Sequence, residues 1–329
     1  MSAARLAPSV LFRRFTLRLY PFPLAFALAL PLAAAAAPFA YVPNEGSGTV
    51  SIVDTATDRV VGTVQTGGKP RGIVVGLDGR KVYVSDQPNN QLIVIDVAAR
   101  AVSGRIALGE SPEGVGLSPD GRWISAAVEE SNDVAFVDTR TDAKAFVVAV
   151  RGKNPEHAVF SPDGRTVVVS AEEGGAVDII DFASRSETAQ VSVGARPRGI
   201  GFSPDSKRAY VAAELSDELF VIDIAAASII GRVKTGKRSN GIVVSPDGSR
   251  IYVSNGGEAT VAIVDAATLT VTATIPVGER PWNMAVTPDG RKLYVACGRS
   301  GGVTVVDTVE ARRVADIPTG KLPWGVTIR

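Results

Sequence analysis

A unit of about 42 residues recurs along this chain from residue 39 to its end, and this repeat constrains the fold more than any other feature. One strand of each unit ends in aspartate, and these residues are Asp54, Asp96, Asp138, Asp181, Asp223, Asp265 and Asp307. A turn aspartate recurs six times at the same interval, at Asp78, Asp120, Asp163, Asp205, Asp247 and Asp289. A fixed period of this length is the signature of a repeat architecture. The strand-ending aspartates count seven units, and the turn is absent from one of them.

Each unit contains the chemistry of short strands joined by tight turns. In Ser-Pro-Asp-Gly, which occurs at 245–248, proline presets φ for a turn and glycine accepts a positive φ. Runs such as Ile251-Tyr-Val and Val261-Ala-Ile-Val are rich in β-branched and aromatic residues, and their length predicts strands. Four strands in about 42 residues match one blade of a β-propeller. We therefore predict an all-β fold, a single seven-bladed β-propeller with four antiparallel strands per blade.

The two ends of the repeat region complement each other. The first unit opens directly on Ala40-Tyr41-Val42 and lacks an innermost strand, whereas residues 323–329 supply an innermost strand and nothing more. We expect the ring to close by pairing of 323–329 with 39–44, which removes two exposed sheet edges. This arrangement also explains why the turn occurs six times and not seven.

Residues 1–36 resemble a secretory signal peptide. Arginines precede the apolar stretch 22–36, which ends in an Ala-x-Ala site, and the apolar core is too short for a confident membrane span. The sequence predicts cleavage near Ala37, a propeller domain over 37–329 and a periplasmic or secreted protein without a stable membrane anchor. Arg13-Arg14 is followed by a poor twin-arginine pattern, so Sec export is favoured. We expect a monomer.

Composition excludes several classes of function. The predicted signal segment holds four of the 35 basic residues and no acidic residue, leaving 31 basic against 34 acidic residues. This balance lacks the positive charge of a nucleic-acid binder. Cys297 is the only cysteine, so there is no intrachain disulfide and no site for covalent haem. No cofactor is predicted, although a divalent cation stays open.

The second residue of the expected innermost strand is the best candidate for function, because seven copies should ring one mouth of the central channel. These residues are Arg71, Glu113, Glu156, Arg198, Asn240, Trp282 and Trp324. The first residue of this strand is proline in six units and Ser239 in the other. The loops after the Tyr-Val strands should open on the same face, adding Glu45, Gln87, Glu129, Glu172, Glu214, Gly256 and Gly298. Charge there could bind a cation or a basic segment, and the tryptophans could stack on a planar ligand or anchor a protein loop. His157, the only histidine, stands where most units have glycine and is a further candidate for ligand contact.

The Tyr-Val pairs, the Val/Ile-Asp strand ends and the Ser-Pro-Asp-Gly turns resemble the YVTN-type β-propellers. A narrower resemblance is to periplasmic propellers associated with pyrroloquinoline-quinone-dependent catabolism, which also follow a signal peptide and end in a Pro-Trp-Gly-Val strand, here at 323–326. The first resemblance implies the fold, and the second implies service to a quinone-dependent dehydrogenase system.

Two functional hypotheses follow. The favoured one is a non-catalytic propeller that binds a protein partner or a small ligand at the channel mouth. The alternative is a metal-dependent hydrolase or lactonase, whose cation would be held by Glu113, Glu156 and His157 with Glu172. A haem-binding propeller is a poorer third option, because one histidine leaves little axial ligation.

Overall fold

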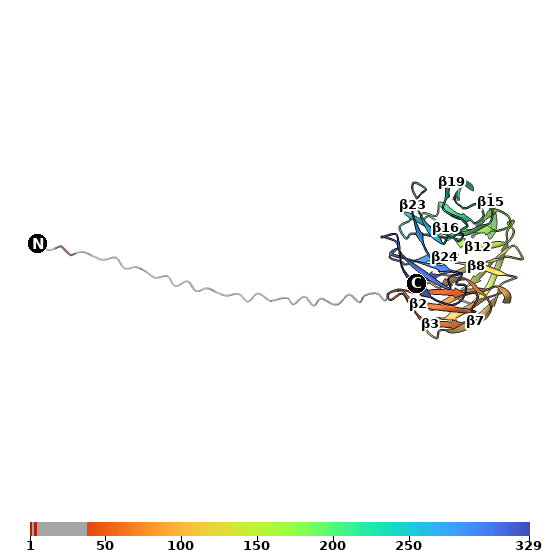
Figure 1. The fold of residues 1–329 in the computed structure, drawn as a ribbon, viewed down its shortest axis with the longest axis horizontal. Helices are drawn as coiled ribbons and strands as arrows, with labels where there is room; N and C mark the ends of the chain where they lie inside the picture. The colour runs from red at the N-terminus through yellow and green to blue at the C-terminus, as the bar shows by residue number, and fades with distance from the viewer. Residues whose placement is uncertain (2, 5–37) are drawn as a thin grey trace. The chain divides into compact units, whose positions relative to one another are not determined.

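A computed structural model describes residues 1, 3, 4 and 38–329 of the chain. Residues 38–329 form seven four-stranded sheets, all antiparallel, arranged around a central channel (Figure 1). The predicted all-β, seven-bladed propeller is therefore confirmed. The signal-peptide prediction falls almost entirely outside the described residues. Among the residues that are described, no helix is long and apolar enough to cross a membrane.

The strands occupy four positions in each blade. The innermost strands are β4 (Pro70–Val75), β8 (Pro112–Leu117), β12 (Pro155–Phe160), β16 (Pro197–Phe202), β20 (Ser239–Val244), β24 (Pro281–Val286) and β28 (Thr327–Ile328). The second strands are β1 (Phe39–Asn44), β5 (Lys81–Asp86), β9 (Trp123–Val128), β13 (Thr166–Ala171), β17 (Arg208–Ala213), β21 (Arg250–Asn255) and β25 (Lys292–Cys297). One short 3₁₀ helix, η1 (Gln87–Asn89), follows β5.

The third and outer strands complete the sheets. The third strands are β2 (Thr49–Asp54), β6 (Gln91–Asp96), β10 (Asp133–Asp138), β14 (Ala176–Asp181), β18 (Glu218–Asp223), β22 (Thr260–Asp265) and β26 (Gly302–Asp307). The outer strands are β3 (Arg59–Gln65), β7 (Ala101–Ala107), β11 (Ala143–Ala149), β15 (Ser186–Ser192), β19 (Ser228–Lys234), β23 (Thr270–Pro276) and β27 (Arg312–Pro318). Blade 1 is β28-β1-β2-β3, and blades 2 to 7 follow in chain order.

The core lies between the blades. Second and third strands are buried on both faces, and for this reason they read as continuous apolar runs, whereas the outer strands alternate between exposed and covered positions. One cluster joins Tyr41 and Ile52 of blade 1 to Ile73 and Val84 of blade 2. Comparable clusters join the other neighbouring blades, so each blade buries its faces only because a neighbour covers them.

Blade 1 is assembled from both ends of the propeller, as predicted. Tyr41 pairs with Thr327 and Ala40 with Ile328. The Trp324 amide donates to the Pro43 carbonyl at 2.9 Å, and the C-terminus lies beside the first blade (Figure 1). The regular part of β28 is only two residues long, so part of the closing contact is irregular backbone.

Candidate functional site

The innermost strands approach one another closely around the channel. A Cβ atom at Gly72 would lie 2.4 Å from the carbonyl oxygen of Glu113 in the next blade, and one at Gly241 would lie 2.4 Å from that of Trp282. These positions therefore require glycine. The close approach of the innermost strands brings the residue before each of these glycine positions to one mouth of the channel. For this reason the seven predicted residues lie together there.

The structure brings all seven of these residues to one cavity of about 330 Å³, which we call the mouth pocket. They are Arg71, Glu113, Glu156, Arg198, Asn240, Trp282 and Trp324. The loop residues Glu45, Glu129 and Glu172 line the same pocket, so the expectation that these loops open on this face is confirmed for them. The binding role of these residues remains a prediction.

A third set of lining residues was missed by the sequence analysis. In most blades, the residue that immediately precedes the innermost strand has a positive φ, for example 60° at Arg196 and 54° at Arg280. Its carbonyl accepts a bond from the amide of the loop residue, as Arg196 does from Glu214 at 2.8 Å. This backbone geometry brings the side chains of Arg196 and Arg280 to the pocket. The 42-residue spacing of Arg196, Arg238 and Arg280 was a readable signal of this set.

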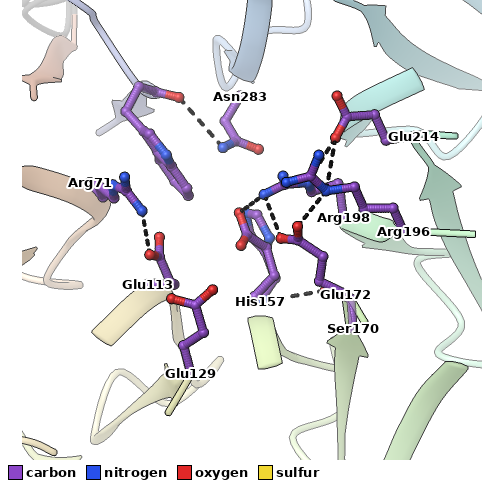
Figure 2. Close-up of polar contacts among 12 residues, drawn as sticks. Arg71, Glu113, Glu129, His157, Ser170, Glu172, Arg196, Arg198, Glu214 and Asn283 are labelled. Carbon is purple, nitrogen blue, oxygen red and sulfur yellow. Dashed lines mark hydrogen bonds and ion pairs between the residues drawn. The ribbon is translucent and has the colours of Figure 1, made fainter. Parts of the chain in front are cut away.

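Arg71 and Glu113 form a buried pair at the acidic side of the pocket (Figure 2). Burial opposes the charge of Arg71, but Glu113 and Glu45 raise its pKa. Burial, and then the charge of Glu156, raise the pKa of Glu113 to about 9, and these effects exceed the opposing one of Arg71. Because a guanidinium keeps its proton in proteins, we assign the proton uptake to Glu113.

This assignment predicts a pH dependence of stability. The pKa of Glu113 rises from 4.5 to about 9 on folding, so between these values the folded state holds a proton that the unfolded chain releases. The free energy of unfolding should therefore fall as the pH rises through this window. Glutamine at position 113 cannot titrate, so in Glu113→Gln the free energy of unfolding should fall less with rising pH. Urea unfolding at about pH 5, 7 and 9 measures this dependence. The exposed Glu173→Gln should keep the full fall, and an equal slope in Glu113→Gln would contradict the assignment.

Three carboxylates of the acidic side lie close together. One ligand oxygen from each of Glu129, Glu156 and Glu172 lies within 4.8 Å of the other two. Two such charges repel by about 3 kcal/mol or more at an effective dielectric constant of about 20. Arg198 partly offsets this repulsion, because it contacts Glu156 at 2.6 Å and Glu172 at 3.0 Å. The Ser111 hydroxyl donates to Glu129 at 2.8 Å, and we find no arginine in contact with Glu129 within residues 38–329.

The metal-binding set expected from the sequence is thus only partly brought together. Glu156 and Glu172 belong to the close group, Glu113 lies beside it, and Glu129 takes the place expected of His157. The His157 ring lies below the pocket, in the channel lining with Asn283 and Trp324. The side chain that replaces glycine on β12 therefore points along the channel and not toward the carboxylates.

Glu214 organises the opposite side of the pocket. Its side chain is fully buried and contacts Arg280 at 2.8 Å, Arg198 at 3.1 Å, Arg196 at 3.6 Å and Arg238 at 3.7 Å. Burial opposes ionisation, but Arg198 and Arg280 lower the pKa of Glu214 below its ordinary value. We call these four arginines the arginine side. The sequence analysis named Arg198 but not Arg196, Arg238 or Arg280, and so it missed most of this positive charge.

Trp324 crosses the channel and closes its floor. Its indole stacks on the imidazole of His157, with ring centroids 5.4 Å apart and planes inclined by 19°, and its carbonyl accepts bonds from Asn283. Trp324 is buried, so one face expected to be open for a planar ligand is already covered. Trp282, on the adjacent blade, lies over Gly298, where a Cβ atom would be 2.8 Å from the indole. The two tryptophans therefore belong to adjacent blades and line the same pocket.

Comparison with protein families supports the fold. Residues 157–314 match the model of the family described as lactonase, 7-bladed β-propeller, and residues 35–120 match that of the YNCE-like β-propellers. No curated protein matches the chain. The chain is therefore a seven-bladed propeller similar to the lactonase and YNCE-like families.

Two solved structures show the same fold. A hydrazine synthase chain of Kuenenia stuttgartiensis aligns with a TM-score of 0.71 and 24% identity, over 78% of this chain and 89% of that one. A functionally unknown protein from Desulfotomaculum acetoxidans aligns with a TM-score of 0.79 and 17% identity, over 88% and 98%. At these identities the likeness concerns architecture alone.

Proposed function

We propose that this chain is a non-catalytic, exported β-propeller that binds a small polar ligand in the mouth pocket. The observation that carries the proposal is the separation of charge across one closed-bottomed pocket. Glutamates of blades 1, 3 and 4, with Arg71 of blade 2 among them, line one side, and arginines of blades 5 and 7 line the other. A ligand with a carboxylate at one end and a cationic or metal-bound group at the other would complement this distribution of charged side chains.

Stability alone does not account for so many buried charges. Removing ion pairs from water costs several kcal/mol per ion, and apolar residues of similar size often serve stability as well. Arginine also presents a planar fork that matches a carboxylate in two parallel hydrogen bonds. Arg280 lines the pocket with 14% of its side chain exposed, so its fork can reach a bound carboxylate without leaving Glu214. A protein partner could offer the same group as an acidic side chain.

The setting of this activity rests on the sequence. The charge pattern of residues 1–36 supports export, and the repeat supports membership of the YVTN-type propellers. The Pro-Trp-Gly-Val terminus motivates an accessory role in a periplasmic quinone-dependent dehydrogenase system. Copurification of such a dehydrogenase with the exported chain would support this part of the proposal, and binding by the pocket does not depend on it.

A second candidate is hydrolysis of a lactone. It is favoured by the match of the lactonase model over 157–314, which includes Arg198, Glu214 and Arg280. Arginines could stabilise the oxyanion of an opening ring, and a carboxylate could activate water. Release of acid from a simple δ-lactone by the purified chain, lost in Arg280→Gln, would favour this candidate over binding alone.

Arg280 provides the direct test of ligand binding. We expect small amino and hydroxy carboxylates to raise the thermal midpoint of the full chain. For the ligand with the largest shift, Arg280→Gln should weaken binding at least about tenfold, or about 1.4 kcal/mol, because the bidentate contact is lost. Isothermal titration calorimetry measures this change.

The matched control is Arg299→Gln, which alters an exposed arginine near the same mouth. It should bind as the unchanged chain does. If no carboxylate shifts the midpoint, or if Arg280→Gln binds unchanged while folded, the arginine side is not the binding site.

A further inference from the structure

We propose that Glu129, Glu156 and Glu172 bind one divalent cation at the acidic side of the mouth pocket, and that this cation is Ca²⁺. The inference deepens the proposed function and rests on it, since the cation would occupy the pole of the pocket opposite the arginine side. Three observations support the inference. They are the spacing of the carboxylate oxygens, the contacts of the three glutamates, and a fourth, buried glutamate in the same pocket.

Spacing is the first argument. Ca²⁺ holds oxygen ligands at about 2.3–2.6 Å, so two oxygens on one ion are at most about 5 Å apart. The three carboxylate oxygens meet this limit, because all lie within 4.8 Å of one another. Mg²⁺ requires about 2.1 Å, which limits the separation to about 4.2 Å. The bound of 4.8 Å therefore satisfies the limit for two oxygens on Ca²⁺ but is wider than that for Mg²⁺, and the spacing favours the larger ion.

The position of the ligands is fixed by the fold. Glu129 and Glu172 follow β9 and β13 directly, and the amide of each is held by a carbonyl of the same blade, at 3.1 and 2.8 Å. Glu156 belongs to β12, between these loops. Three ligands on two neighbouring blades are thus preorganised before any ion arrives.

The surrounding charges leave room for a cation. Arg198 contacts one oxygen of Glu156, whose other oxygen has no ion pair, whereas Glu172 contacts Arg198 through one oxygen and Arg196 through the other, so a cation would share this carboxylate with them. Glu129 receives the Ser111 hydroxyl on one oxygen. Among the described residues, no arginine forms an ion pair with Glu129. We therefore expect its negative charge to contribute most to the affinity for the cation.

A fourth carboxylate provides the independent observation. Glu113 is 99% buried, lines the same pocket, and its Oε2 has no hydrogen-bond partner among the described residues. Figure 2 shows Glu113 beside Glu129, with its carboxyl group turned toward Arg71. A buried polar atom without a partner is rare and requires an explanation. A water molecule held by an ion at the three glutamates would supply this partner, and such a contact is compatible with the protonated Glu113 assigned above.

The donor set also selects the class of metal. All candidate ligands are carboxylate oxygens, which suit hard cations such as Ca²⁺ and Mg²⁺. The one imidazole nearby, that of His157, stacks on Trp324 and lines the channel below. Zinc, which prefers nitrogen and sulfur ligands, is therefore disfavoured.

Calorimetry with CaCl₂ tests the inference on the full chain after dialysis against a chelator. We expect one site with a Kd of about 10⁻⁵ to 10⁻³ M, weaker binding of MgCl₂, and a rise in thermal midpoint with CaCl₂. Glu129→Gln should weaken Ca²⁺ binding at least about tenfold, because one formal charge of the ligand set is lost. Glu172→Gln should act in the same direction and provides a second variant should the first fold poorly. The exposed neighbour Glu130→Gln is the matched control and should bind as the unchanged chain does.

Two results would overturn the inference. One is the absence of heat and of a midpoint shift with CaCl₂ for the folded, unsubstituted chain, and the other is unchanged Ca²⁺ binding in both glutamate variants. Carboxylate binding measured in the presence of chelator separates this inference from the proposed function. Its persistence without any Ca²⁺ binding removes the cation alone, whereas loss of both removes the pocket as a binding site.

Discussion

Deletion of residues 323–329 is expected to abolish cooperative unfolding of the propeller and to leave an aggregation-prone chain. The segment supplies the innermost strand of blade 1, and Trp324 and Val326 are buried. Its loss exposes the edge of β1 and removes the stacking partner of His157. Loss of a buried tryptophan alone typically costs about 3–5 kcal/mol, a large part of the stability of a domain.

Thermal unfolding followed by circular dichroism, with light scattering for aggregation, measures this effect. A synthetic peptide of residues 323–329 added to the truncated chain is the control, and it should restore part of the transition by completing the sheet. A thermal midpoint equal to that of the full chain would show that the ring does not depend on this closure.

Glu214→Gln is expected to be the most damaging single substitution in the mouth pocket. The carboxylate is fully buried among Arg196, Arg198, Arg238 and Arg280, so removing its charge leaves these arginines without their shared counter-ion. Breaking a buried ion pair in this way costs about 3–5 kcal/mol. Urea unfolding near neutral pH measures the loss.

The pH dependence and a double variant identify the cause. The lowered pKa of Glu214 stabilises the folded state above the ordinary carboxyl value, and this contribution is lost as the pH falls through the folded pKa. The difference in the free energy of unfolding between the unsubstituted chain and Glu214→Gln should therefore become smaller as the pH falls. Arg198→Met combined with Glu214→Gln should cost less than the sum of the single changes. Additive losses would mean that the ion pair is not responsible.

The sequence allowed the fold to be predicted because each position in the repeat corresponds to one radius and one height in the ring. For the same reason it placed Arg71, Glu113 and Trp282 at one mouth without any structure. The closing contact of blade 1 followed from what each end lacked. Such predictions depend on the period, which is a property of the sequence.

Other features depend on contacts that cross the channel, and no period describes them. Trp324 covers His157 because blades 1 and 4 face each other, and this contact removes the histidine from the carboxylates. Arg280 reaches Glu214 two blades away because the backbone before β24 has a positive φ. The spacing of the arginines was visible, but the direction of their side chains required the backbone.

The composition of blade 1 also has a consequence for biosynthesis. Residue 40 pairs with residue 328, near the end of the sequence. Until this last segment has been synthesised, blade 1 lacks its innermost strand and the ring cannot close. Contacts between residues so distant in sequence form slowly, because the chain between them must be ordered first. The nascent protein therefore passes through translation with β1 unpaired on one side, as an exposed sheet edge that could pair with another chain.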